Sequence, residues 1–308
     1  MNNPIFETAK PGVKLIFTLF IIFSSLLIFI ILGILISIPI FGIEFSRLQS
    51  FLNPGVASNI PFLKYFQAVQ SIAMFVIPPF VIAFISSQSV KKYLFINQKL
   101  EFISIILLFL LMISSIPIIN FYAVLNSKMQ LPGFLSYLEK GMKDSEENAR
   151  IITETFLLVK TPMGLAVNIL IIAIIPALGE ELLFRGILQR QFTELTKNPH
   201  IGILIGAIIF SAIHFQFYGF LPRMLMGILF GYLLFWSKNL WFPIVAHFIN
   251  NAFAVTAFYF FHGSDLERQA ETVGSEPSQI SLLLISCLVF IGILLYIKKR
   301  KQTLSIFI

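Results

Sequence analysis

Long apolar runs separated by short polar connections repeat along most of the chain. Eight runs approach or exceed the roughly 20 residues that a helix needs to cross about 30 Å of hydrocarbon. They cover residues 14–42, 65–87, 102–125, 163–188, 201–217, 219–237, 240–261 and 279–297. The pattern predicts an all-α, polytopic integral membrane protein with about eight transmembrane helices. The first run is too long for a signal peptide and lacks a small-residue cleavage site, so we expect it to be retained.

One connection, residues 126–162, is long and has a pattern of its own. Apolar residues such as Leu138, Met142 and Phe156 recur there at helical spacing among charged ones, which predicts amphipathic helices on the outer surface or capping the bundle. We therefore expect a single membrane domain, residues 1–308. It consists of three N-terminal spans (14–125), this extracytoplasmic connection (126–162), a core of four spans (163–261), and a last span with a basic tail (279–308).

Composition and charge agree with this fold and predict an orientation. Hydrophobic residues make up 57% of the chain and charged residues 12%, against about 25% charged residues in soluble domains, which excludes a water-soluble globule. When the loops alternate from a cytoplasmic N-terminus, 13 of the 22 lysines and arginines but only five of the 15 acidic residues fall on the cytoplasmic side. Because basic residues favour that side, both termini are expected there, and the net charge of +7 reflects orientation and not nucleic-acid binding.

The abundance of Ile, Phe and Lys favours a prokaryotic plasma membrane, with the endoplasmic reticulum as the alternative. The only cysteine, Cys287, provides no disulfide framework.

Ionisable side chains inside apolar runs are costly and usually functional, and nearly all of them lie in the second half of the chain. Glu181 and Arg185 stand four residues apart on one helical face, so they can pair, whereas Glu180 points about 100° away. A carboxylate that is unpaired and removed from bulk water is a stronger base than a solvated one. The spacing therefore predicts Glu180 as a general base supported by the other two residues, and Pro176 is expected to kink the helix just before them.

Two more runs bring polar groups to a similar depth. Glu180 lies 17 residues before the turn at Lys197, and His214 lies 17 residues after it, so in an antiparallel hairpin the two can meet. His247 and Asn251, again four residues apart, present an imidazole and an amide that could donate hydrogen bonds to an oxyanion. Explanations without chemistry also exist: the glutamates could be counter-ions for nearby arginines, and the histidines could link helices.

At these residues the chain resembles the CAAX protease and bacteriocin-processing (CPBP) family, also called the Abi or type II CAAX prenyl endopeptidase family, of polytopic glutamic intramembrane endopeptidases. The motifs of that family are EExxxR, FxxxH and HxxxN, and all three occur here in order and in separate spans. They are matched by Glu180, Glu181 and Arg185, by Phe210 and His214, and by His247 and Asn251. The resemblance covers about residues 163–255 and implies a conical bundle with an intramembrane cavity.

The resemblance further implies a division of roles within the site. Glu180 and His214 would activate a water molecule, and His247 and Asn251 would form the oxyanion hole. From its position in the run, Phe210 is expected to pack one turn before His214. No metal or other cofactor is implied. The expected activity is metal-independent hydrolysis of a peptide bond in a membrane-associated protein or peptide, in a cavity reached from the cytoplasm, with prenylated CAAX-type proteins as one candidate substrate class.

Two other functions stay open at this point. His214, His247 and a carboxylate could bind zinc, although the chain has no HExxH motif. Alternatively, the polar groups could tie helices together in a non-enzymatic immunity or transport scaffold. The partners expected on any of these hypotheses are a peptide or protein and membrane lipid.

Overall fold

A computed structural model describes residue 6 and residues 9–306, without the side chains of residue 271 and of residues 301–306, into which the predicted basic tail extends. In this part of the chain every regular element is a helix and there is no strand. Among the described residues, seven helices are long and apolar enough to cross a membrane: Pro11–Phe41, Ala57–Ser86, Phe102–Ser127, Pro162–Thr196, Phe220–Ser237, Trp241–Phe261 and Pro277–Arg300. The chain is an all-α integral membrane protein, as the apolar runs predicted.

The fifth predicted span, 201–217, is shorter than expected. Helix α11 (Pro199–Ala212) has 14 residues, or about 21 Å at 1.5 Å per residue, which is less than the roughly 30 Å of hydrocarbon. The apolar run continues past residue 212, but the helix does not. Phe215 has a left-handed φ of 53°, which a helix cannot contain. Residues 213–219 form a turn before helix α12 (Phe220–Ser237). His214 therefore lies in a turn and not within a spanning helix.

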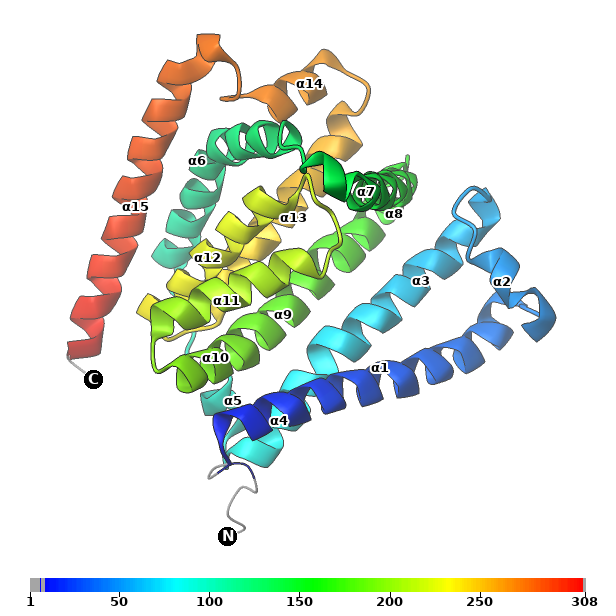
Figure 1. The fold of residues 1–308 in the computed structure, drawn as a ribbon, viewed down its shortest axis with the longest axis horizontal. Coiled ribbons are helices and arrows are strands. Elements are labelled where there is room, and N and C mark those ends of the chain that lie inside the picture. Colours follow the sequence, from blue (N-terminus) through cyan, green and yellow to red (C-terminus); the bar gives the residue numbers. More distant parts are fainter. Residues whose placement is uncertain (1–5, 7–8, 307–308) are drawn as a thin grey trace.

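The N-terminal part of the chain forms a long helical hairpin. Its first arm is α1 (Pro11–Phe41), and its second arm is the continuous helix made of α3 (Ile60–Ser71), the π-helical segment η3 (Ile72–Val76) and α4 (Ile77–Ser86). The short helices η1 (Phe45–Arg47), α2 (Leu48–Phe51) and η2 (Ala57–Asn59) connect the arms. Figure 1 shows that this hairpin diverges from the other helices toward its α2 end, whereas η3 and α4 contact the helix that contains α9 and η6.

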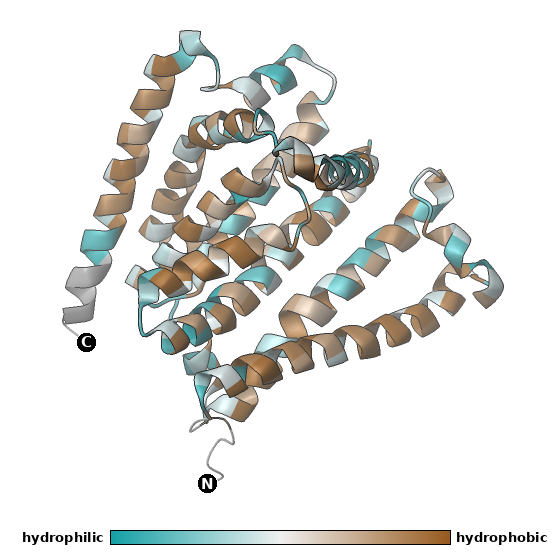
Figure 2. Ribbon diagram, viewed as in Figure 1, coloured by the Kyte–Doolittle hydropathy of each residue, from teal (hydrophilic) through white to brown (hydrophobic). Residues whose placement is uncertain are grey.

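The remaining spans pack around one central helix, Pro162–Thr196. It is built from α8 (Pro162–Asn168), η5 (Ile169–Ile174), α9 (Ile175–Glu181), η6 (Leu182–Leu188) and α10 (Gln189–Thr196), of which η5 and η6 are π-helical. Helices α11, α12 and α13 (Trp241–Phe261) pack in succession beside it, and α6 (Phe102–Ser127) pairs with α15 (Ile280–Ile306) on the outside. Figure 2 shows that α1 and α15, at the two flanks, are apolar along most of their length, as lipid-facing helices should be.

Side-chain contacts define one end of the bundle, which carries both termini. Lys14 at the start of α1 pairs with Glu194 near the end of α10 (Nζ to Oε2, 3.0 Å). Arg300 of α15 pairs with Glu101, just before α6. The backbone N–H of Leu240 donates to the Phe95 carbonyl at 2.9 Å, which joins two further loops. The start of α1 and the end of α15 thus share an end with the turns at residues 87–101, 197–198 and 238–240. The short helix α11 runs between the two ends of the bundle as the seven long helices do.

The opposite end carries α7 (Ser136–Leu157), preceded by η4 (Gly133–Leu135), and α14 (Asp265–Thr272). The amide of Asn126 donates to the Phe217 carbonyl at 2.9 Å and accepts from the Leu221 N–H at 2.6 Å. The backbone N–H of Tyr218 donates to Glu146 Oε2 of α7 at 2.7 Å. The turn 213–219 is therefore held by α6 and α7, so α7 packs on this end of the bundle, which is one of the two placements that its amphipathic pattern predicted.

The turn after α13 is built on Gly263, whose φ of +76° suits glycine. Glu267 of α14 accepts hydrogen bonds from the Gly263 backbone N–H at 2.6 Å and from His262 Nδ1 at 3.0 Å. These two bonds hold the pKa of the Glu267 carboxyl below its ordinary value, and the bond from His262 has the larger effect.

The α10–α11 hairpin places the second motif beside the first. Lys197 has a left-handed φ of 54°, and the Asn198 side chain accepts from the backbone N–H of His200 and of Ile201, which starts α11. Gly202 lets the two helices approach, since a Cβ there would lie 2.8 Å from the Thr193 backbone nitrogen.

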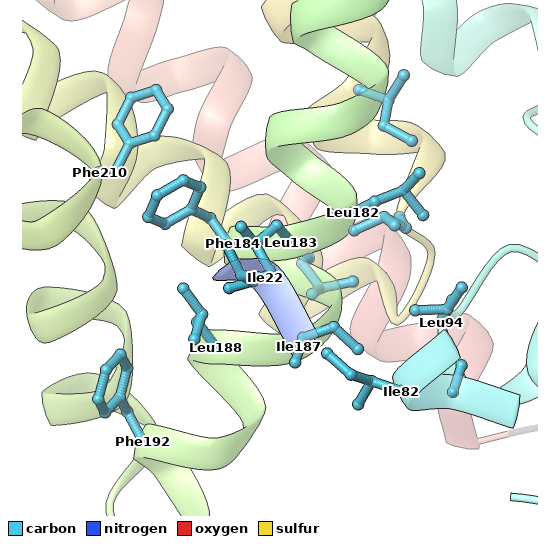
Figure 3. Close-up of a cluster of buried hydrophobic side chains, with 14 residues drawn as sticks. Ile22, Ile82, Leu94, Leu182, Leu183, Phe184, Ile187, Leu188, Phe192 and Phe210 are labelled. Carbon is cyan, nitrogen blue, oxygen red and sulfur yellow. The ribbon is translucent and has the colours of Figure 1, made fainter. Parts of the chain in front are cut away.

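A buried apolar cluster surrounds η6. Leu182, Leu183, Phe184, Ile187 and Leu188 are all buried, and they pack with residues from α1, α4, α11 and α13. Figure 3 shows Phe184 and Phe210 lying close together in this cluster. Every residue of η6 is buried, Arg185 included, so the segment after the acidic pair is enclosed on all sides.

Candidate active site

The helix that carries the acidic pair is wound irregularly on both sides of α9. Pro176 has no backbone N–H, so it cannot donate to the carbonyl of Ile172, four residues earlier. That carbonyl instead accepts a hydrogen bond from Asn251 Nδ2 of α13 at 3.2 Å. π-Helical segments often occur at functional sites, and here the proline leaves a backbone acceptor for the third motif.

Glu181 and Arg185 form the buried ion pair that their spacing predicts. The distance from Arg185 Nη1 to Glu181 Oε1 is 2.9 Å, and the side chains are only 3% and 0% exposed. The guanidinium also donates to the Gly227 carbonyl at 3.2 Å. It lies 4.4 Å from the ring centre of Phe210 and 5.5 Å from that of Phe230, distances at which cation–π attraction is expected.

Glu181 has a second partner that the sequence did not reveal. His247 Nδ1 lies 2.9 Å from Glu181 Oε1, and because a carboxylate only accepts, Nδ1 carries the hydrogen. The imidazole stacks on Phe230 at 5.2 Å between ring centres. Its other nitrogen, Nε2, lies 4.0 Å from Glu180 Oε2. Glu181 thus fixes both Arg185 and the ring orientation of His247.

His214 is oriented by its own motif. Its Nδ1 lies 2.8 Å from the Phe210 carbonyl, which can only accept, so Nδ1 donates and Nε2 is left as an acceptor in the neutral ring. The Phe210 ring packs edge-on against both His214 (5.4 Å) and His247 (6.1 Å). Phe210 therefore does more than pack one turn before the histidine, since its backbone sets the tautomer.

One cavity of about 370 Å³ collects these residues. It is lined by the predicted site residues Glu180, Phe210, His214, His247 and Asn251, together with Pro176, and also by Gln67, Asn250, Gly219, Arg223 and several apolar side chains. The Glu180 side chain is 12% exposed and accepts no hydrogen bond from any residue that the structure describes. The predicted convergence of the three motifs is therefore present, with His214 reaching the cavity from the turn after α11.

Asn250 and Arg223 were not predicted as site residues. Asn250 does not fit the motif spacing, but its Nδ2 donates to Asn251 Oδ1 at 3.2 Å and orients that amide. Arg223 belongs to no motif, yet an arginine inside the apolar run 219–237 is the kind of intramembrane charge that marks a site. That signal could have identified it.

The cavity lies toward one end of the bundle. Its polar lining includes His214 and Gly219 from the turn 213–219 and Arg223 from the start of α12. These lie at the end of the bundle that carries α7, opposite the end with the termini. The polar lining of the cavity therefore lies toward the end of the bundle that carries α7.

The zinc hypothesis can be compared with the same geometry. Among the residues that the structure describes, no three His, Cys, Asp or Glu side chains gather as a metal site would require. The Nδ1 atoms of His214 and His247 are both engaged with protein acceptors.

A family model described as "Type II CAAX prenyl endopeptidase Rce1-like" matches residues 162–253. The chain contains an Rce1-like domain. This domain begins with α8, ends within α13, and includes every residue of the three motifs. The family resemblance read from those motifs is confirmed.

Two proteins of Bacillus subtilis (strain 168) match parts of the chain. "Uncharacterized protein YpbD" is 34% identical over 89 residues, which are 28% of this chain and 42% of that protein. "Putative membrane peptidase YdiL" is 28% identical over 125 residues, which are 41% of this chain and 48% of that protein. The matches span less than half the length of either relative, and no solved structure matches the chain.

Proposed function

We propose that this chain is a glutamic, metal-independent intramembrane endopeptidase that hydrolyses a peptide bond in a membrane-associated protein or peptide. The observation that carries the proposal is the carboxylate of Glu180. It faces a polar cavity without a hydrogen-bond partner among the described residues, beside the two oriented histidines His214 and His247. A carboxylate used only to neutralise a cation would be engaged as Glu181 is.

The proposed reaction starts with a water molecule between Glu180 and His214. Glu180 takes a proton from the water as the water oxygen bonds to the substrate carbonyl carbon. The acceptor nitrogen Nε2 of His214 orients the water by accepting its other hydrogen. Glu180 then gives the proton to the amide nitrogen as the C–N bond breaks, which releases an amine and a carboxylic acid. No other co-reactant is needed.

The oxyanion formed in this reaction needs hydrogen-bond donors. Asn251 uses one of its two N–H groups on the Ile172 carbonyl, which leaves the other for the oxyanion. His247 can donate from Nε2 only when the ring carries both protons, and Glu181 and Glu180 would balance that charge at 2.9 Å and 4.0 Å. This division of roles agrees with the one that the family resemblance implies.

An apolar cavity of about 230 Å³ adjoins the polar one and shares Ile119, Pro222 and Met226 with it. Its lining from α6, α12 and α15 is almost entirely apolar. We propose it as the place of an isoprenoid or other lipid chain, which keeps prenylated CAAX-type proteins among the candidate substrates.

The deciding experiment is cleavage of a fluorogenic farnesylated CAAX peptide, and of its unprenylated form, by purified protein in detergent. Glu180→Gln should lower kcat by about 10²–10⁴ without changing the unfolding midpoint, whereas Arg150→Gln, an exposed change on α7, should alter neither. A zinc chelator should have no effect. Activity that a chelator removes would favour a zinc peptidase, and activity that survives Glu180→Gln would remove Glu180 as the base.

We also propose that the protein lies in a prokaryotic plasma membrane with both termini in the cytoplasm, as its basic residues favour. Substrates would then enter the cavity from the extracytoplasmic side, whereas a CAAX protein made in the cytoplasm would require the reverse orientation. In a Cys287→Ser background, a membrane-impermeant maleimide should label intact cells carrying Lys160→Cys, before α8, and not those carrying Lys197→Cys. The opposite labelling would restore cytoplasmic entry.

A further inference from the structure

Arg223 lies in the cavity of Glu180 and His214 without the partner that a buried guanidinium normally has. Its Nη1 is buried and makes no hydrogen bond to any described residue. Its Nη2 donates to a neutral acceptor, Gln216 Oε1, at 2.5 Å. Glu146 and Glu180 are near enough for their charges to interact with it, but neither forms an ion pair within 4.0 Å.

The other arginine of the site shows what a purely structural cation looks like here. Arg185 has a carboxylate at 2.9 Å, a carbonyl at 3.2 Å and aromatic rings around its guanidinium. A cation without such partners in an apolar environment raises the free energy of the folded protein. Arg223 lines a cavity, where an anion could complete its set of partners.

The surrounding backbone keeps this guanidinium in place. Gly219 lies against it, since a Cβ at that position would be 2.9 Å from Arg223 Nη2. The turn before α12 is fixed by the Tyr218 N–H, which donates to Glu146, and by Asn126, which binds on both sides of that residue. Glu146 Oε2 accepts from the turn, and the carboxylate forms no ion pair with Arg223 within 4.0 Å.

We infer that Arg223 binds a carboxylate of the substrate near the bond that is cleaved. The inference rests on the proposed peptidase function, because it places this carboxylate in the same cavity as Glu180. A cavity of about 370 Å³ would be about 9 Å across if it were spherical, which corresponds to about three extended residues. The carboxylate is thus the chain terminus or an acidic side chain within about three residues of the cleaved bond, and Arg223 determines specificity without taking part in the chemistry.

Binding can be measured separately from cleavage in the Glu180→Gln background, where the probe stays intact. The probe is a fluorescent farnesylated peptide ending in Cys-Val-Ile-Met, prepared with a free C-terminal carboxylate, as its C-terminal amide, and as an amide with Glu in the last position. Anisotropy in detergent gives the Kd of each. The free acid should bind about 10- to 100-fold more tightly than the plain amide, as expected for a charge-assisted hydrogen-bonded pair. The Glu-ended amide shows whether a side-chain carboxylate can replace the terminal one.

Adding Arg223→Gln should remove the preference for the acid and leave the Kd of the plain amide unchanged. Arg223→Lys should retain part of the preference, and Gly219→Ala, which displaces the guanidinium, should weaken it. Arg150→Gln is the matched control and should change none of the values. The inference would be overturned by any of three results: equal binding of acid and amide before Arg223 is changed, a preference for the acid that survives Arg223→Gln, or no binding of any peptide.

Failure of the proposed function gives a different result. If the protein with Glu180 intact cleaves no peptide while the acid preference and its loss in Arg223→Gln persist, the carboxylate site stands and the peptidase proposal falls. If cleavage occurs with equal kcat/KM for acid and amide, the peptidase proposal stands and Arg223 is a structural residue.

Discussion

Replacing Glu181 and Arg185, singly and together, measures how strongly the buried ion pair holds the site. At 2.9 Å and an effective dielectric constant of about 20, the gross attraction is about 6 kcal/mol. Breaking a buried pair by removing one partner typically costs about 3–5 kcal/mol, because the other charge stays buried and uncompensated. Both side chains are nearly inaccessible to water, at 3% and 0% exposure, so this range applies here.

The two single variants should differ in a defined direction. In Glu181→Gln the guanidinium keeps the Gly227 carbonyl and its aromatic neighbours, so the loss should be near 3 kcal/mol. In Arg185→Met the carboxylate keeps only His247 and the loss should be near 5 kcal/mol. The double variant buries neither charge and should lie within about 2 kcal/mol of the unmodified protein.

Denaturant titration in detergent micelles, followed by fluorescence of the two tryptophans Trp236 and Trp241, gives the unfolding free energies. The exposed pair of Arg150 and Glu147 is the matched control, and its loss should have little or no effect. Costs that add in the double variant would refute the coupling, and single-variant costs as small as the control would refute burial of the pair.

Replacing Pro176 with alanine restores a backbone N–H that competes with Asn251 for the same carbonyl, so kcat should fall about tenfold or more while the unfolding midpoint stays the same or rises; unchanged kcat would contradict this. Gly202→Ala forces a Cβ toward the Thr193 backbone and should cost about 1–3 kcal/mol of stability; thermal unfolding in detergent measures it, and an unchanged midpoint would contradict the close approach. Glu267→Gln should loosen the turn after α13 near neutral pH. The pKa of Glu267 is lowered in the folded protein, so the unmodified protein should have the more stable turn above the ordinary glutamate pKa of about 4.5 and lose this difference as pH falls through the folded pKa. Amide hydrogen exchange in the turn should show this, and a difference independent of pH would argue against it.

The sequence determined what local periodicity and spacing can encode. Apolar length identified the spans other than 201–217, and the four-residue spacing of Glu181 and Arg185 predicted their ion pair, because both features depend only on the geometry of one helix. The equal distances of Glu180 and His214 from the turn at Lys197 predicted that they share a depth, because α10 and α11 are joined directly.

Only the tertiary structure decided contacts between segments that are distant in the chain. Glu181 binds His247 across 66 residues, and Asn251 binds the carbonyl that Pro176 leaves free in another helix. Such contacts depend on the rotation of each helix about its axis, which packing sets and hydropathy does not record. The same holds for the end of α11 at residue 212, where the turn 213–219 is fixed by α6 and α7, and for the entry of Arg223 into the cavity beside Glu180.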